Sequence, residues 1–254
     1  MSGGGLETAA AVELIKIAVK QKWFKKLINV FKKKHKVLVL GSTGVGKTNL
    51  IESITEITPE IIHHMNRTEF IKNHHIEISK KPFIFTDPPG QAGHKHERNK
   101  GIIDILKMKS PVAGIINVVS YGYHEYRIGL SDVFDNNGNL FDTFLERHRQ
   151  VEIDALNEWI PLIGSPEIVK WVVTVVTKAD LWWDEKDKVI KYYESGEYFN
   201  NLGDAKPIHH VVEHCSVVHR FFGKGKISPI FDDAERIRTR VNLLRMLTEA
   251  IGKN

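Results

Sequence analysis

One short glycine-rich segment constrains the fold of this chain more than any other part of the sequence. Residues 41–48 read Gly-Ser-Thr-Gly-Val-Gly-Lys-Thr, and they lie between an apolar run at 36–40 and a segment at 49–57 that suits a helix. Glycines at these spacings let backbone N–H groups turn inward around phosphate oxygens, and the following helix adds its positive N-terminal end. The pattern predicts a phosphate-binding P-loop between a strand and a helix.

Two side chains in this segment have specific predicted roles. We expect the Lys47 ammonium to neutralise the β- and γ-phosphates of a nucleotide, and the Thr48 hydroxyl to ligate Mg²⁺. The residues expected to contact the nucleotide phosphates are Gly41, Ser42, Thr43, Gly44, Val45, Gly46, Lys47 and Thr48.

Apolar runs alternate with segments of helical periodicity through the rest of the chain. We expect further strands at 69–78, 82–86, 112–119, 169–176 and 208–214, and further helices at 97–107, 142–160, 184–195 and 232–251. Such alternation predicts a three-layer α/β domain with parallel strands. Residues 120–141 have no clear periodicity, and we expect them to form an inserted surface loop.

A second motif places a carboxylate at the end of an apolar strand. Residues 83–86 lead directly to Asp87, which is followed by Pro-Pro-Gly-Gln at 88–91. An aspartate at a strand end beside a P-loop is where a partner of Mg²⁺ belongs. We expect the backbone N–H of Gly90 to face the γ-phosphate and the Gln91 side chain to orient the attacking water.

A third motif bears on the identity of the base. Thr177, Lys178 and Asp180 follow the apolar run 171–176. A carboxylate at this place accepts hydrogen bonds from the guanine N1–H and 2-amino groups, a donor pair that adenine lacks. The aliphatic stem of Lys178 would cover the plane of the base. The motif therefore favours a guanine nucleotide over ATP.

In this order, the motifs resemble those of the Ras-like P-loop GTPases, in the translation-factor-related class. The resemblance covers residues 36–251 and includes the segments at 41–48, 87–90, 177–180 and 215–217. It implies a P-loop NTPase fold with a six-stranded, mostly parallel sheet, and binding of GTP and GDP with Mg²⁺. It also implies two switch loops that GTP orders, and slow intrinsic hydrolysis that a partner accelerates.

The resemblance also assigns roles in the first switch. Thr68 is the best candidate for the threonine that ligates Mg²⁺ when the γ-phosphate is present, with Thr55 and Thr58 as alternatives. Arg67 is a candidate for an arginine that stabilises the transition state from within the chain, although an exposed loop arginine is the simpler interpretation. The expected catalytic residues are Gln91, Lys47 and Thr68, and the expected metal ligands are Thr48, Thr68 and Asp87.

One further segment corresponds to a loop whose backbone touches the guanine oxygen in the resembling proteins. It consists of Cys215, Ser216 and Val217, which follow the last predicted strand. Val217 stands where alanine is usual, so the match is not complete.

The basic charge of the chain is concentrated at its N-terminus. Residues 1–36 hold nine lysines and two glutamates, whereas the whole chain has a formal net charge of +5, so the remainder is slightly acidic. We expect residues 1–35 to form a basic amphipathic helix outside a GTPase domain at 36–254. Its apolar face suits an anionic membrane surface, a partner protein or a second copy, or packing on its own domain. Nucleic acid is not expected, because the domain is slightly acidic.

Cysteine content and hydropathy bear on the compartment. Cys215 is the single cysteine, so we expect a reducing, cytoplasmic location, with peripheral membrane attachment left open. No uncharged apolar stretch is long enough to span a bilayer. The histidine spacings are not typical of a zinc site.

Two functions are compatible with these patterns. The first is a Mg²⁺-dependent GTP hydrolase that acts as a conformational switch and responds to a protein regulator or effector. The second is a GTP-gated recruitment module with negligible hydrolysis, which binds a membrane or protein partner through the basic N-terminal helix.

Overall fold

The structure is a computed structural model of the chain. It describes residues 35–55, 72–78, 81–88, 95–106, 112–125, 132–163, 169–203, 209–217, 222–223, 227 and 230–252. Several predicted features lie outside the described residues. Of the helix expected at 1–35, only His35 is described, as the first residue of β1. The other undescribed features are Thr58, Arg67, Thr68, Gly90 and Gln91.

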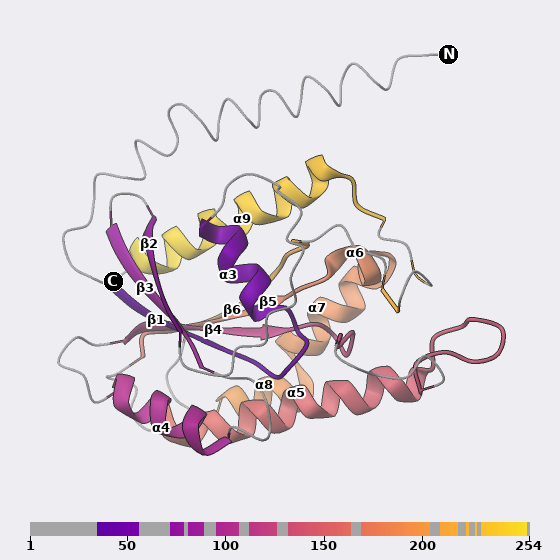
Figure 1. The fold of residues 1–254 in the computed structure, drawn as a ribbon, viewed down its shortest axis with the longest axis horizontal. Coiled ribbons are helices and arrows are strands. Elements are labelled where there is room, and N and C mark those ends of the chain that lie inside the picture. The colour runs from indigo at the N-terminus through magenta and orange to yellow at the C-terminus, as the bar shows by residue number, and fades with distance from the viewer. Residues whose placement is uncertain are drawn as a thin grey trace, which may run out of the picture.

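One six-stranded sheet forms the centre of the molecule (Figure 1). Its strands are β1 (His35–Leu40), β2 (Lys72–Ile78), β3 (Lys81–Asp87), β4 (Val112–Val119), β5 (Trp171–Val176) and β6 (His209–His214). They lie in the order β2-β3-β1-β4-β5-β6, and every neighbouring pair is parallel except β2 and β3. The predicted α/β fold with a mostly parallel sheet is confirmed, with five parallel strands and one antiparallel strand at the edge.

Helices cover both faces of the sheet and complete the three layers (Figure 1). One face carries α3 (Lys47–Thr55) and α9 (Asp233–Gly252). The other face carries α4 (Lys95–Leu106), α5 (Asp142–Ile163), α7 (Lys186–Glu194) and α8 (Gly196–Gly203). Two short helices, α6 (Ala179–Trp182) and η3 (Trp183–Glu185), follow β5. The carboxyl ends of the parallel strands meet at one edge, where open α/β sheets bind ligands.

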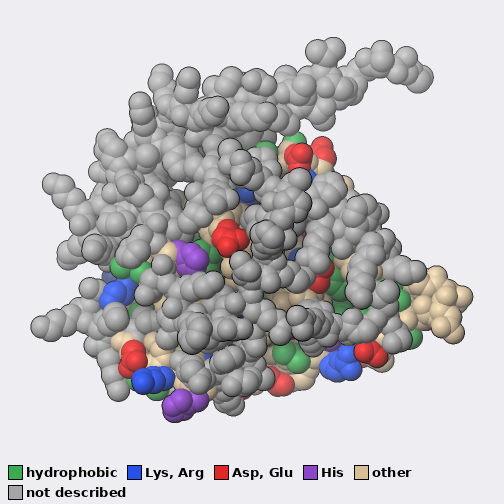
Figure 2. Space-filling model, viewed as in Figure 1, with side chains coloured by type: hydrophobic (Ala, Val, Ile, Leu, Met, Phe, Trp, Pro, Cys, Tyr) green, Lys and Arg blue, Asp and Glu red, His purple; other side chains and the backbone are tan. Residues whose placement is uncertain are grey.

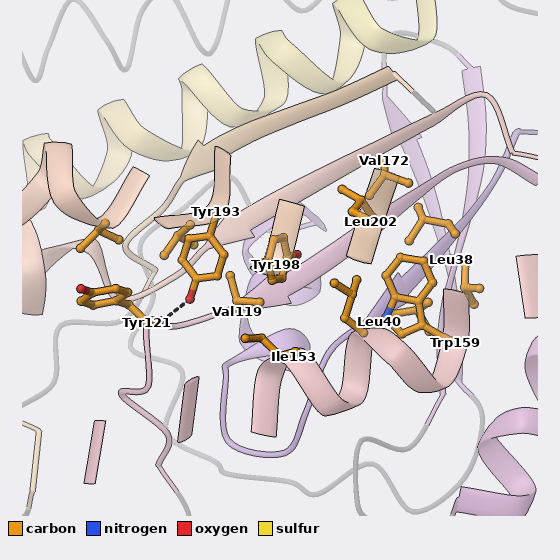
Figure 3. Packing of buried hydrophobic residues seen from close by; sticks show 14 of the residues in the cluster. Leu38, Leu40, Val119, Tyr121, Ile153, Trp159, Val172, Tyr193, Tyr198 and Leu202 are labelled. Atoms are coloured by element: carbon orange, nitrogen blue, oxygen red, sulfur yellow. Dashed lines mark hydrogen bonds between the residues drawn. The ribbon is translucent and has the colours of Figure 1, made fainter. Parts of the chain in front are cut away.

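Alternating side chains of the strands supply the core on both faces. In β1, Leu38 and Leu40 belong to the apolar cluster beneath α5, α7 and α8, whereas Val37 and Val39 belong to the cluster beneath α3 and α9. Figure 3 shows the first cluster, in which Trp159 of α5 lies beside the two leucines. Because the central strands are buried on both faces, they appear in the sequence as nearly continuous apolar runs.

The sequence patterns missed helix α8. This helix begins at Gly196, which has a φ of 73°, and ends at Gly203. Glycines at both ends favour a turn over a helix when only the sequence is considered. Tyr198 and Leu202 lie four residues apart and are both buried. Tertiary packing of this face therefore stabilises the helix.

The predicted insertion at 120–141 is described except for residues 126–131. Phe134 and Leu140 form an isolated antiparallel bridge. Phe134 also packs in a small apolar cluster that includes Phe222, a residue between β6 and α9. The described part of the insertion is thus packed against the domain.

The described surface carries charges of both signs. On the face shown in Figure 2, both acidic and basic side chains of the described residues are visible. Among the described helices, none is both long and apolar enough to cross a membrane.

Candidate functional site

The predicted P-loop connects β1 to α3, and glycine is required at two of its positions. Gly41 and Gly44 have φ values of 138° and 82°, in the region that favours glycine. A Cβ on Gly41 would lie 2.2 Å from the Val118 carbonyl oxygen, and one on Gly44 would lie 2.9 Å from the Glu125 nitrogen. The backbone therefore approaches two neighbouring segments more closely than any side chain allows.

Lys47, the first residue of α3, points back over this loop. Its Nζ donates to the carbonyl oxygens of Gly41 at 2.8 Å and Ser42 at 3.0 Å, and the residue is 8% exposed. Burial lowers the pKa of Lys47, against the opposing effect of the Asp87 carboxylate. A buried ammonium of this kind is stabilised by a negative charge brought to it. Within the described part of the chain, the buried Ser42 hydroxyl makes no hydrogen bond. Both features suit a phosphate group.

The two described metal-ligand candidates lie beside each other. Thr48 Oγ1 donates to Asp87 Oδ2 at 3.4 Å, and Asp87, the last residue of β3, is fully buried. A hydroxyl and a carboxylate at this spacing, next to a phosphate site, are hard oxygen ligands that suit Mg²⁺. Thr55, an alternative in the sequence prediction, ends α3 about 10 Å along the helix axis from Thr48, at 1.5 Å per residue. The role of Thr55 stays a prediction.

Lys178 joins the predicted base-binding motif to the P-loop. Its backbone is left-handed, with φ 55° and ψ 39°, a conformation that is uncommon for a residue with a side chain. Its Nζ donates to the Gly44 carbonyl oxygen at 3.0 Å and to the Tyr123 carbonyl oxygen. The preceding Thr177 hydroxyl donates to the Val45 carbonyl oxygen at 2.5 Å. The P-loop and the base motif are thus directly connected.

Asp180 lies between the base motif and the segment after β6. Its Oδ1 accepts a 2.6 Å hydrogen bond from the Ser216 hydroxyl, and the residue is 4% exposed. Burial raises the pKa of Asp180, and the hydrogen bond from Ser216 opposes that shift. The Ser216 N–H in turn donates to Thr239 Oγ1 of α9 at 3.2 Å. The structure therefore brings Asp180 and the predicted guanine-oxygen loop together.

Cys215 extends the ladder of β6 into this loop. Its N–H donates to the Val176 carbonyl oxygen at 3.0 Å, and its own carbonyl accepts from the Ala179 N–H at 3.3 Å. Burial raises the pKa of the Cys215 thiol to about 12. Val217 is half-buried and packs against the cluster beneath α3 and α9. The side chains of Cys215 and Val217 therefore pack in the interior of the domain.

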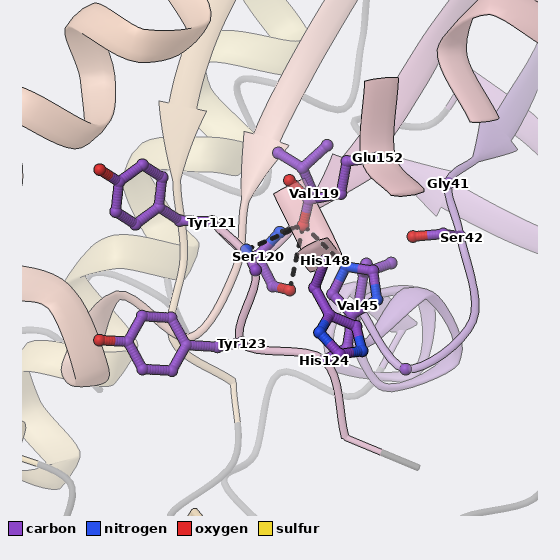
Figure 4. A network of polar contacts seen from close by, with 12 residues as sticks. Gly41, Ser42, Val45, Val119, Ser120, Tyr121, Tyr123, His124, His148 and Glu152 are labelled. Carbon is purple, nitrogen blue, oxygen red and sulfur yellow. Dashed lines mark hydrogen bonds and ion pairs between the residues drawn. The ribbon is translucent and has the colours of Figure 1, made fainter. Parts of the chain in front are cut away.

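The sequence prediction missed the segment 120–125, which follows β4. Its Glu125 N–H donates to the Gly44 carbonyl oxygen at 3.1 Å, beside the contact between Tyr123 and Lys178. Figure 4 shows this segment next to the P-loop. In the sequence, only the lack of periodicity from residue 120 onward marks it. Its contacts with the P-loop and with α5 join residues far apart in the sequence, so no local motif marks them.

Arg98 is a second residue that no motif singled out. It lies in the first turn of α4, is 9% exposed, and forms an ion pair with Glu158 of α5. Its charge contributes to lowering the pKa of Lys47, after the larger effects of burial and Asp87. An arginine of the helix that follows Asp87 is thus close enough to Lys47 to affect its charge.

The described site residues converge at the carboxyl edge of the sheet. The P-loop follows β1, Asp87 ends β3, Lys178 and Asp180 follow β5, and Ser216 follows β6. The predicted roles of Thr68, Gly90 and Gln91 stay predictions, because these residues lie outside the described ranges.

One comparison with protein families agrees with this arrangement. The model of a family described as 50S ribosome-binding GTPases matches residues 36–156, from β1 into α5. No curated protein matches the sequence.

Two solved structures show a distant likeness. The Arl6 BBS3 small GTPase from Trypanosoma brucei, solved with the bound nucleotide analogue GppNp, is 13% identical with a TM-score of 0.49, over 85% of this chain and 98% of that chain. A dimerisation-deficient mutant of Toc33 from Arabidopsis thaliana is 15% identical with a TM-score of 0.49, over 98% of this chain and 93% of that chain.

Two findings together define the class of this protein. One is the family match, and the other is that one sheet brings together a P-loop, a strand-end aspartate and a base motif. The chain contains a Ras-like P-loop GTPase domain. Domains of this class bind guanine nucleotides at the edge where the described site residues meet.

Proposed function

We propose that this protein binds GTP together with Mg²⁺, hydrolyses it to GDP, and changes conformation with the bound nucleotide. The observation that carries the proposal is the position of the Lys178 ammonium. This ammonium donates to the Gly44 carbonyl oxygen of the P-loop, and Lys178 itself lies two residues before Asp180 in the base motif. A phosphate-binding element and a base-binding element are thereby held at a fixed separation, as one bound nucleotide requires.

Base recognition rests on Asp180. The Ser216 hydroxyl fixes one carboxylate oxygen, which leaves lone pairs on both oxygens for the guanine N1–H and 2-amino groups. Adenine would present no such donor pair, so the buried carboxylate would remain unsatisfied. Selection of guanine over adenine follows from this loss.

Hydrolysis is an in-line attack of water on the γ-phosphorus. A bond forms between the water oxygen and phosphorus, and the bond to the β,γ-bridging oxygen breaks, so GDP leaves with the electron pair and inorganic phosphate carries the added oxygen. We assign Gln91 to orienting the water. Lys47 and the P-loop N–H groups stabilise the charge that develops on the phosphate oxygens.

The residues present fit a magnesium ion. Thr48 and Asp87 would hold it from the protein side, with Thr68 joining when the γ-phosphate is bound. Bound Mg²⁺ would neutralise part of the negative charge of the nucleotide phosphates.

A recruitment role for the basic N-terminal segment is the alternative. Residues 1–36 carry nine lysines, which suits a protein partner or an anionic membrane surface in the cytoplasm. In that case nucleotide binding would gate recruitment, and turnover would be negligible. A protein regulator or effector is part of both proposals.

The test is phosphate release by the purified protein with Mg²⁺ and either GTP or ATP. Asp180→Ala is compared with Asp184→Ala, which removes an exposed carboxylate four residues away. We expect GTP-selective turnover that Asp180→Ala abolishes and Asp184→Ala retains. Faster turnover of ATP would contradict the base assignment, and GTP binding without turnover would favour the recruitment role.

A further inference from the structure

A buried carboxylate on α5 collects hydrogen bonds from the segment 120–125. Glu152 is 2% exposed, and its Oε1 accepts from the backbone N–H groups of Ser120 at 2.8 Å and Gly122 at 3.3 Å. The same oxygen accepts from His124 Nε2 at 3.0 Å (Figure 4). Its Oε2 accepts from the Tyr193 hydroxyl of α7 at 2.6 Å.

These donors keep Glu152 ionised. Burial raises the pKa of Glu152, but the hydrogen bonds from His124 and Tyr193 and the backbone hydrogen bond from Ser120 outweigh burial and lower it. A carboxylate that accepts several N–H and O–H groups is stabilised in its charged form. Glu152 therefore acts as an internal anion around which the loop is arranged.

The loop adopts a conformation that needs such support. Tyr121 has a φ of 53° and Gly122 a φ of 84°, so two consecutive residues are left-handed. A Cβ on Gly122 would lie 2.4 Å from the Leu145 carbonyl oxygen. The Tyr121 N–H donates to the Tyr193 hydroxyl at 2.9 Å (Figure 3). That hydroxyl itself donates to Glu152. Surrounding contacts of this kind maintain a backbone that is rare for a non-glycine residue.

The other side of the same loop faces the nucleotide site. The Glu125 N–H donates to the Gly44 carbonyl oxygen, and the Tyr123 carbonyl oxygen accepts from Lys178. Gly44 also accepts from Lys178, so the three segments form a closed set of contacts. The residues that contact Glu152 and the residues that contact the P-loop or Lys178 thus all lie within the six consecutive residues 120–125.

We propose that Glu152 is a positioning residue of the nucleotide site, which fixes the segment 120–125 so that Tyr123 and Glu125 hold Lys178 and Gly44 in place. The inference rests on guanine-nucleotide binding at this site, and it adds a residue that no nucleotide motif contains. Glutamine at this position keeps the shape but has one acceptor oxygen for several donors, and its amide would face the Tyr193 hydroxyl. Loosening the loop then releases Lys178, and the bound nucleotide leaves faster.

The experiment measures the dissociation rate of a fluorescent GDP from the full-length protein. Variants are Glu152→Gln, Lys178→Ala and their combination, with Asp154→Asn as the control that removes an exposed carboxylate from the same helix. We expect Glu152→Gln to accelerate dissociation about tenfold, equivalent to ~1.4 kcal/mol, and Asp154→Asn to stay within about twofold.

A coupling measurement separates positioning from general destabilisation. If Glu152 acts through Lys178, the double variant dissociates no faster than Lys178→Ala alone, because the same contact is already lost. The proposal would be overturned if the increase in dissociation rate of the double variant equalled the product of the increases in the two single variants. It would also be overturned if Glu152→Gln folded and released GDP at the wild-type rate.

Tyr193→Phe provides a second test in case Glu152→Gln does not fold. It removes only the hydroxyl between Tyr121 and Glu152, so we expect about a threefold faster dissociation that is again masked by Lys178→Ala. Normal rates in this variant would contradict the proposal. Failure of the wild-type protein to bind GDP would instead refute the proposed function, and the inference with it.

Discussion

Asp180→Asn changes the hydrogen-bonding pattern of the base site while preserving its shape. In the structure, Asp180 Oδ1 already accepts from the Ser216 hydroxyl at 2.6 Å. Asparagine keeps that contact by pointing its carbonyl oxygen toward Ser216, which places its NH₂ group where the second carboxylate oxygen stood. That NH₂ then faces a donor of guanine, so one hydrogen bond to the base becomes a donor–donor contact and the other loses its charge.

The magnitude follows from the value of hydrogen bonds to charged groups. One such bond contributes about 1.5–3 kcal/mol, and an opposed donor adds to the loss, so a total of about 3 kcal/mol is expected. At 1.4 kcal/mol per factor of ten, GDP affinity falls by roughly a hundredfold. Xanthine carries a carbonyl in place of the 2-amino group of guanine, and this carbonyl can accept a hydrogen bond from the NH₂ of the introduced asparagine. The affinity for a xanthine nucleotide should therefore rise where the affinity for GDP falls.

The assay measures how well GDP and xanthosine diphosphate (XDP) each displace a fluorescent nucleotide from the protein at constant Mg²⁺. The Asn variant should prefer XDP, whereas Asp184→Asn, which alters an exposed side chain nearby, should retain the wild-type preference. Two results would refute the reasoning: GDP affinity of the Asn variant within about threefold of the wild type, or no gain for XDP.

Three further predictions concern turnover, folding and pH. Gln91→Ala should slow phosphate release and leave GTP affinity unchanged, and equal turnover would remove Gln91 from the mechanism. Gly44 and Gly138 both have φ near 80°, so alanine at either position should cost about 1–3 kcal/mol of backbone strain. Gly44→Ala should lower the free energy of unfolding by more than Gly138→Ala, because only the Cβ at position 44 would meet backbone atoms within 3 Å. Equal losses in denaturant titrations would contradict the clash. Burial lowers the pKa of His148 to about 4. Between pH values of about 6.5 and 4, the unfolded chain therefore takes up a proton on this side chain and the native protein does not. The free energy of unfolding should accordingly fall as the pH drops through this range. His148→Gln should show a weaker pH dependence of the melting temperature, and an identical dependence would count against this residue.

The parts of the site that the sequence predicted are those whose chemistry is local. Gly41 to Thr48 are contiguous, so their spacing alone indicates a phosphate loop. Asp87 and Asp180 each end or follow a strongly apolar strand, and parallel strands bring their carboxyl ends to one edge. The sheet was predictable for the same reason, because strands buried on both faces leave a clear apolar signal.

The parts that the sequence missed depend on contacts between distant residues. Glu152 looks like one more charged residue on an amphipathic helix, yet its partner Ser120 lies 32 positions away. Arg98 and Glu158 are 60 positions apart on two different helices. No local periodicity encodes such pairs, since the fold alone brings them together. Helix α8 was missed because its stability comes from packing, against the turn preference of its glycines.

The burial of Cys215 has a practical consequence for observing this protein at work. It is the single cysteine of the chain, and its raised thiol pKa leaves almost no reactive thiolate at neutral pH. A cysteine introduced at an exposed position, such as that of Asp184, would then be the only sulfur that a maleimide dye modifies. Fluorescent reporters can therefore be attached at chosen positions without replacing the native cysteine that follows β6.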